Sequence, residues 1–241
     1  TKDGAEKIAV PGLDDAALAL VVAAASGQRF KGEAGSVAEA YVPSGRVLLL
    51  GVGSGDDAGY ERAGGALTAR LLTSGVTAVT VDLSGTRATA EAAARLAAGA
   101  AQRAWRYDVY RTKLPADAKP TLTDITIVGA PEGIDAAWTA RDAVTKGLEL
   151  TKTLVTLPAN ILYPDSFVER VTKDVEGLGL EITVVDEAAM QELGMGALLG
   201  VSQGSRREAR ILALREAFPD QQICAGNVAT AEAARALVDA G

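Results

Sequence analysis

Apolar residues along the chain occur in short blocks separated by glycine, proline and helix-capping residues. Short runs of aliphatic residues predict buried strands, and longer alanine-rich stretches with apolar residues three or four positions apart predict helices. The predicted strands are residues 47–50, 78–83, 124–128, 181–185, 210–214 and 222–225. The predicted helices are residues 14–26, 60–72, 89–109, 133–157, 166–177, 187–193 and 231–240. The repeated order of strand and helix predicts an α/β fold with helices packed on a largely parallel sheet.

The longest predicted helix lies between Gly133 and Leu157, and Pro158 stops it. Its apolar positions recur at roughly helical spacing, while its charged residues can point elsewhere. A single long helix between two α/β segments is typical of an interdomain connector. We therefore place a domain boundary within it.

Composition restricts the classes of function. The chain has 241 residues, of which 48% are hydrophobic, so it can bury a substantial core. The 24 Lys and Arg against 31 Asp and Glu give a net charge of -7, and no basic run is longer than Arg206-Arg207. These features argue against nucleic acid and anionic membranes as partners, because such binding needs clustered cations. The longest wholly apolar run, residues 16–25, is shorter than the roughly 20 residues of a membrane span.

Cysteine and histidine usage narrows the chemistry further. The single cysteine, Cys224, permits no internal disulfide, and no signal peptide is evident, so we expect a cytoplasmic protein. Histidine is absent. Histidine-containing zinc sites, Ser-His-Asp triads and imidazole acid–base catalysis are therefore excluded for these 241 residues.

Two motifs in the second half of the chain carry a family resemblance. They are Leu157-Pro-Ala-Asn-Ile-Leu-Tyr-Pro164 and Leu193-Gly-Met-Gly-Ala-Leu-Leu-Gly-Val-Ser-Gln-Gly-Ser205. In order and separation they resemble the region just before the metal site of the leucyl (cytosol) aminopeptidases, and a more diffuse likeness extends over about residues 14–214. The resemblance implies a hexameric exopeptidase with an amino-terminal α/β domain, a linking helix and a catalytic domain. It also implies two divalent metals, zinc or manganese, that activate water and polarise the scissile carbonyl.

The metal-binding motifs of that family do not follow in this sequence. They are a Val-Gly-Lys-Gly segment leading to Phe-Asp-x-Gly-Gly, and a later Asn-Thr-Asp-Ala-Glu-Gly-Arg segment. The last lysine is Lys173, which precedes the position expected for the metal-binding lysine. We therefore assign no catalytic, cofactor-binding or metal-binding residue.

The last residues resemble a different family. The segment Ala225-Gly-Asn-Val-Ala-Thr230 is similar to a strand–helix unit of the inosine monophosphate dehydrogenase and guanosine monophosphate reductase barrels. In a barrel, Asn227 would follow a strand at the active-site face, but in this chain we interpret it as a turn residue. We expect a junction near residues 214–217, arising from a fusion by design or recombination, or else a natural truncated paralogue.

These resemblances define four segments. They are an amino-terminal α/β domain (1–133), the connector helix (134–158), the start of an aminopeptidase-like catalytic domain (159–215) and a strand–helix unit (216–241). The first hypothesis is a non-catalytic α/β scaffold, a truncated or chimeric aminopeptidase without the dimetal site. In the second, the chain is a piece of a metal-dependent leucyl aminopeptidase that hydrolyses peptides when its catalytic segment is supplied. A homo-oligomer is compatible with both.

A third hypothesis is a small-ligand binding module. The segment Gly51-Val-Gly-Ser-Gly55 follows a predicted strand, and glycines there could let a phosphate approach the amino terminus of the next helix. The segment lacks the last glycine of the dinucleotide fingerprint.

Overall fold

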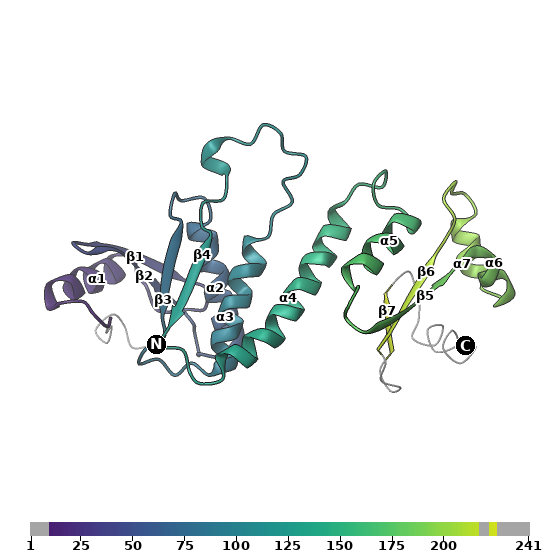
Figure 1. Cartoon of the computed structure of the whole chain (residues 1–241). Helices are drawn as coiled ribbons and strands as arrows, with labels where there is room; N and C mark the ends of the chain where they lie inside the picture. The colour runs from purple at the N-terminus through teal and green to yellow at the C-terminus, as the bar shows by residue number, and fades with distance from the viewer. Residues whose placement is uncertain (1–9, 217–221, 226–241) are drawn as a thin grey trace. The chain divides into compact units, whose positions relative to one another are not determined.

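The computed structural model describes residues 10–216 and 222–225 and divides the chain between Thr153 and Leu154. The first unit, unit 1, comprises residues 1–153, and unit 2 comprises residues 154–241. In unit 1 the elements are α1 (Asp15–Gly27), β1 (Val37–Val42), β2 (Gly45–Leu50), α2 (Asp57–Leu71), β3 (Ala78–Asp82), α3 (Ala90–Ala104), a 3₁₀ turn (Ala116–Ala118) and β4 (Asp124–Val128). Helix α4 (Ile134–Thr156) crosses the division. Unit 2 continues with α5 (Pro164–Asp174), β5 (Leu180–Val185), α6 (Glu187–Glu192), α7 (Gly196–Ser202), β6 (Ile211–Glu216) and β7 (Gln222–Ala225) (Figure 1).

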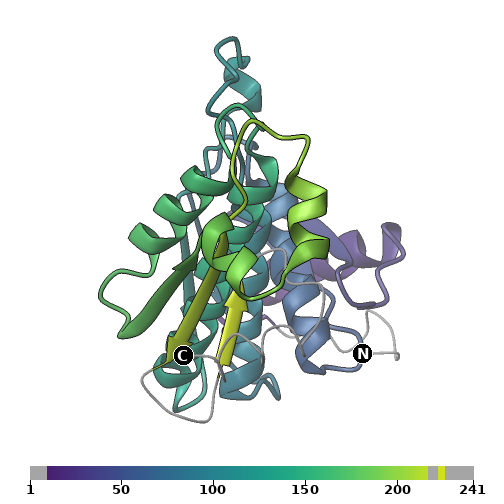
Figure 2. The ribbon, with the colours of Figure 1, turned by 90° about the vertical axis from the view of Figure 1, so that its right-hand side faces the viewer.

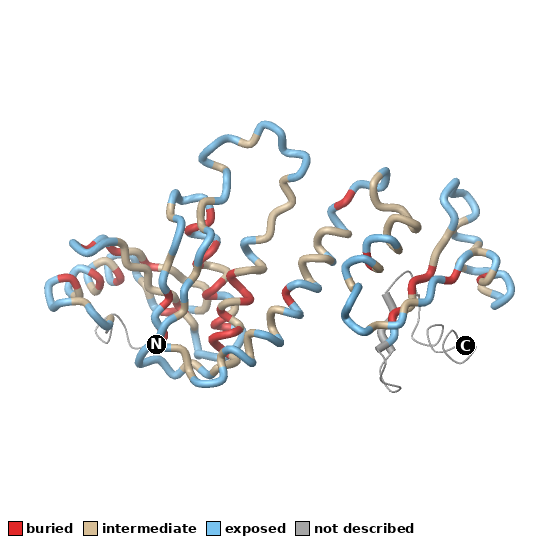
Figure 3. The backbone as a smooth tube through the Cα atoms, viewed as in Figure 1, coloured by how far each residue is buried: buried red, intermediate tan, exposed pale blue. Residues whose placement is uncertain are grey.

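The main core of unit 1 lies between helices α2 and α3 and the adjoining strands. Strands β1 and β2 form an antiparallel pair, and β3 and β4 form a parallel pair whose crossover contains α3. Leu67, Leu71 and Leu96 are each 1% exposed, and they pack with Val81 of β3. Figure 3 shows buried positions gathered in this part of unit 1. A second cluster, formed by Val21, Ala40 and their neighbours, packs α1 against the β1–β2 pair.

Glycines allow α2 and α3 to approach each other unusually closely. A Cβ atom on Gly64 would lie 1.9 Å from the Leu96 carbonyl oxygen, and one on Gly99 would lie 2.0 Å from the Glu61 carbonyl oxygen. Each helix therefore places a glycine against the backbone of the other. Any side chain at either position would force the helices apart.

Helix α4 has 23 residues and ends just before the Leu157-Pro158 pair. Proline cannot continue a helix, so the end follows from the sequence. No helix in the described ranges is both long and apolar enough to cross a membrane.

Unit 2 is built on a three-stranded antiparallel sheet in the order β5–β6–β7 (Figure 2). Alternate residues of β5 and β6 face opposite sides. Ile182 and Leu214 belong to the cluster that packs on α5, whereas Val185 and Ile211 pack with Met190 of α6 and with residues of α7. The sheet is therefore covered by helices on both faces.

The α/β class, the long helix and the strand at residues 222–225 are confirmed, whereas the predicted sheet pairing needs correction. Only β3 and β4 pair in parallel among the described strands, and the remaining pairs are antiparallel. Strand β1 was not predicted because its inward positions are Ala38, Ala40 and Val42, which give only a weak apolar signal. Helix α7 was not predicted, and the predicted helix at residues 231–240 lies outside the described residues.

The predicted helix at residues 89–109 ends earlier, at Ala104. Trp105 is extended, with φ -57° and ψ 130°, and its ring stacks on Tyr107 with 6.4 Å between centroids. Side chains two residues apart point to different sides of a helix, so this stacking requires an extended backbone.

Candidate functional site

The first family motif, Leu157–Pro164, joins α4 to α5 in unit 2. Pro164 occupies the first turn of α5, and the Ser166 hydroxyl accepts a hydrogen bond from the Tyr163 backbone N–H at 2.9 Å. The Arg207 guanidinium lies over the Tyr163 ring, 3.7 Å from its centroid. These contacts fix the start of α5 and join it to the loop that leads into β6.

The second motif, Leu193–Ser205, contains α7 and lines a polar hollow of about 480 Å³. Glu187 organises one wall: its Oε1 accepts hydrogen bonds from the Ser202 hydroxyl at 3.2 Å and from the Ala209 backbone N–H at 2.9 Å. The Glu187 carboxylate therefore holds α6, α7 and the following loop together.

The glycine-rich loop of unit 1 uses its own N–H groups internally. The backbone N–H groups of Gly51, Gly53 and Gly55 donate to carbonyl oxygens of unit 1 at 2.8, 2.8 and 3.0 Å. The amino terminus of α2 is capped by Asp56, whose Oδ1 accepts from the Gly59 N–H at 2.7 Å. A phosphate-binding loop needs such N–H groups to face a ligand. This geometry therefore argues against the small-ligand hypothesis based on this loop.

Asp14 and Asp56 each cap a helix of unit 1. Asp14 caps α1 by accepting a hydrogen bond from the Ala17 N–H at 2.8 Å. A hydrogen bond from the Ser54 hydroxyl, followed by the bond from the Gly59 N–H, lowers the pKa of Asp56. Each of these carboxylates accepts a hydrogen bond from a backbone N–H in the first turn of the helix that it caps.

Candidate metal ligands among the described residues are Cys, Asp and Glu side chains. Residues 10–216 and 222–225 contain no group of three or more Cys, Asp or Glu side chains placed to hold a metal ion, and the sequence has no histidine. Two divalent cations need several converging oxygen or nitrogen ligands. The described residues therefore offer no such group, and the sequence-based assignment of no site residue stays a prediction.

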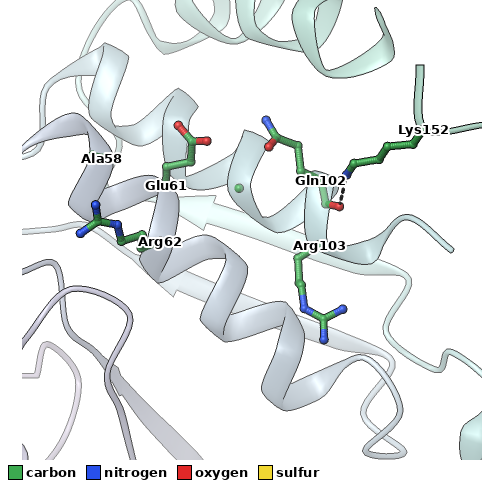
Figure 4. A pocket seen from close by; sticks show the side chains of 7 residues that line it. Ala58, Glu61, Arg62, Gln102, Arg103 and Lys152 are labelled. Atoms are coloured by element: carbon green, nitrogen blue, oxygen red, sulfur yellow. Dashed lines mark hydrogen bonds between the residues drawn. The ribbon is translucent and has the colours of Figure 1, made fainter. Parts of the chain in front are cut away.

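A charged hollow of unit 1 lies across α2, α3 and the last turns of α4 that belong to this unit (Figure 4). It has a volume of about 520 Å³, and its lining residues are Ala58, Glu61, Arg62, Gly99, Gln102, Arg103 and Lys152. Glu61 and Gln102 project on the same side, and Arg62 and Arg103 point outward from the rim. The Lys152 Nζ donates to the Gln102 carbonyl oxygen at 2.9 Å and lies 5.6 Å from the Trp105 ring centroid.

An ion-pair chain borders this hollow. Arg95 binds Glu61 at 3.1 Å and Glu91 at 3.0 Å, and the Arg141 Nε of α4 donates to the same Glu91 at 2.7 Å. The hydrogen bond from Arg141, followed by that from Arg95, lowers the pKa of Glu91. These ion pairs attach α4 to α3. They also include Glu61, the carboxylate among the lining residues of the hollow.

Comparison with known proteins identifies the family. A model of the cytosol aminopeptidase family, N-terminal domain, matches residues 2–114, and a model of the cytosol aminopeptidase family, catalytic domain, matches residues 149–222. Together these two models of one family match well over half of the sequence. The chain belongs to the cytosol aminopeptidase family.

The curated proteins that the chain resembles include probable cytosol aminopeptidases of two bacteria. That of Caulobacter vibrioides is 39% identical over 200 residues, which cover 80% of this chain and 40% of the relative. That of Methylorubrum populi is 37% identical over 203 residues, covering 81% of this chain and 40% of the relative. The chain thus spans about 40% of the length of these relatives.

Solved structures agree with this assignment. A mutant of tomato leucine aminopeptidase has a TM-score of 0.72 and 26% identity, covering 84% of this chain and 42% of that one. The bottromycin maturation enzyme BotP in complex with Mn has a TM-score of 0.67 and 25% identity. The match covers 81% of this chain and 42% of the BotP chain.

The predicted junction near residues 214–217 can be compared with the extent of the catalytic-domain match. The catalytic-domain model extends to residue 222, past the junction expected near residues 214–217. Resemblance to the nucleotide dehydrogenase barrels was predicted for residues 216–241, and no comparison shows it. Asn227 lies outside the described residues.

Proposed function

We propose that the 241-residue chain acts as a non-catalytic α/β scaffold of the cytosol aminopeptidase family. It supplies the amino-terminal domain, the connecting helix and the first part of the catalytic domain. The observation that carries the proposal is the donor set: the described residues offer no cluster of metal ligands, and the lysine and carboxylate motifs of the resembled family are absent from the sequence. Hydrolysis in that family depends on two divalent metals, zinc or manganese.

The alternative is that the chain is one piece of a metal-dependent leucyl aminopeptidase. Its support is the coverage of relatives, because both domain models match although only about 40% of each relative's length is represented. In this case unit 1 and the first elements of the catalytic domain hold a separate catalytic segment, which removes amino-terminal residues from peptides.

An activity assay separates the two functions. The purified chain is incubated with leucine p-nitroanilide and either manganese or zinc, with the full-length Caulobacter vibrioides relative as a positive control. The scaffold proposal expects release of p-nitroaniline no faster than in a metal-only blank. Turnover by the chain alone contradicts it.

Complementation tests the alternative directly. The chain is co-expressed with the part of the same relative's catalytic domain that lies beyond the matched region, and the pair is assayed with each metal. Activity that neither polypeptide shows alone supports the enzyme piece. Purification of both polypeptides as an inactive complex supports the scaffold.

We further propose that the chain self-associates in the cytoplasm, as the family resemblance suggests. The exposed apolar side chains Val144 and Val155 of α4, which are 59% and 81% exposed, are compatible with a protein–protein contact. Light scattering during size-exclusion chromatography gives the mass directly, and a mass of 24.6 kDa at all concentrations contradicts self-association.

A further inference from the structure

The charged hollow of unit 1 has an excess of positive charge in a chain whose net charge is -7. Its lining contains three cations, Arg62, Arg103 and Lys152, and one carboxylate, Glu61. Arg95 binds that carboxylate at 3.1 Å and so offsets its charge. A ligand in the hollow therefore meets a local field opposite in sign to that of the whole molecule.

Hydrogen-bond donors of the hollow remain available for a ligand. Within the described part of the chain, the guanidinium groups of Arg62 and Arg103 form no hydrogen bond or ion pair, and the Gln102 side-chain amide forms no hydrogen bond. Both arginines are exposed and have long side chains, so rotation about their side-chain bonds can bring them over the hollow without disturbing the core.

One part of the lining of the hollow is closely packed. This part is Gly99, where the two helices approach so closely that a Cβ atom would lie 2.0 Å from the Glu61 carbonyl oxygen. On one side Lys152 is held by its hydrogen bond to the Gln102 carbonyl oxygen. Donors from α2 and α3 therefore border a surface at which the two helices pack closely.

We propose that this hollow binds a small oxyanion through Arg62, Arg103 and Gln102. The ligand class is a compact carboxylate or phosphate, because guanidinium groups match the paired oxygens of both. A volume of about 520 Å³ admits a small molecule, and the net negative charge of the chain disfavours long polyanions such as nucleic acids. This binding is independent of the proposed scaffold function.

The test is a titration of the isotope-labelled full chain, followed by NMR, with inorganic phosphate in one arm and citrate in the other. We expect saturable shifts of the Gly99 and Gln102 amides in at least one arm, and the tighter arm identifies the anion class. Because a charge-assisted hydrogen bond contributes a large part of such weak binding, the Arg62→Gln/Arg103→Gln double variant should raise the dissociation constant at least about tenfold. Gln102→Ala should raise it roughly threefold without changing the charge.

Arg87→Gln is the matched control, because Arg87 is an exposed arginine of the same unit that does not line the hollow. It removes one positive charge by the same Arg→Gln change, outside the hollow, and should leave the dissociation constant unchanged. The proposal is overturned if neither anion gives saturable shifts, if the shifts map to other residues, or if the double variant and the control bind equally well.

Discussion

At Glu39, several donors converge on one carboxylate. Arg46 Nε lies 2.5 Å from Oε1, the Tyr41 hydroxyl donates to the same oxygen at 2.6 Å, and Arg70 Nε donates to Oε2 at 3.0 Å. The Glu39 side chain is 8% exposed. The close ion pair with Arg46 is the largest cause of a pKa lowered to about 2, followed by the hydrogen bond from Tyr41. The carboxylate joins both strands of the β1–β2 hairpin to α2.

This cluster predicts a pH dependence of stability. The folded pKa is depressed, so the unfolded chain takes up the proton first as the pH falls; the stabilisation is present above pH 4.5 and is lost towards pH 2. Glu39→Gln should lower the free energy of unfolding at pH 7 by roughly 1 to 3 kcal/mol and weaken its decline in acid. Urea unfolding between pH 7 and pH 2.5 measures both effects.

Glu33→Gln is the control for that prediction, since the exposed Glu33 carboxylate forms no hydrogen bond to any described residue. The free energy of unfolding of Glu33→Gln should equal that of the unmodified chain at every pH. Parallel pH profiles for Glu39→Gln and the unmodified chain would show that the cluster contributes nothing to the acid response.

At the scale of elements, the α2–α3 crossing depends on two glycines. Gly64→Ala or Gly99→Ala places a methyl group within about 2 Å of a backbone oxygen, as the Cβ distances of 1.9 and 2.0 Å indicate. We expect each substitution to lower the free energy of unfolding by roughly 2 to 4 kcal/mol, because the helices must separate. Chemical denaturation monitored by circular dichroism measures the change.

Gly65→Ala and Gly147→Ala provide contrasting controls. A Cβ atom on Gly65 would lie 3.6 Å from the Gly99 carbonyl oxygen, and one on Gly147 would have no neighbour within 4 Å. Both lie inside helices, where alanine is favoured over glycine by up to about 1 kcal/mol, so neither variant should be destabilised. Equal losses at all four glycines would exclude close helix contact as the cause.

At the scale of the whole molecule, the two units have separate cores. Leu67 belongs to the main cluster of unit 1 and Met190 to a cluster of unit 2, and these clusters share no residue. Leu67→Ala and Met190→Ala should each cost roughly 2 to 5 kcal/mol. The double variant should show the sum of the two losses to within about 0.5 kcal/mol. Equilibrium unfolding of the unmodified chain, the two single variants and the double variant measures these losses. A large coupling energy between the two substitutions would show that the two cores are not independent.

The sequence by itself determined the α/β class, the long helix ended by Pro158, most strands, and the family, because these depend on local periodicity, breaker residues and short motifs. Tertiary structure decided the strand pairing, since antiparallel and parallel neighbours can share the same apolar pattern. It also decided the charged hollow, whose lining residues Arg62 and Arg103 are distant in sequence and border one surface because α2 and α3 pack closely at Gly64 and Gly99. Contacts between distant segments leave no periodic signal in either segment, so only the folded chain reveals them.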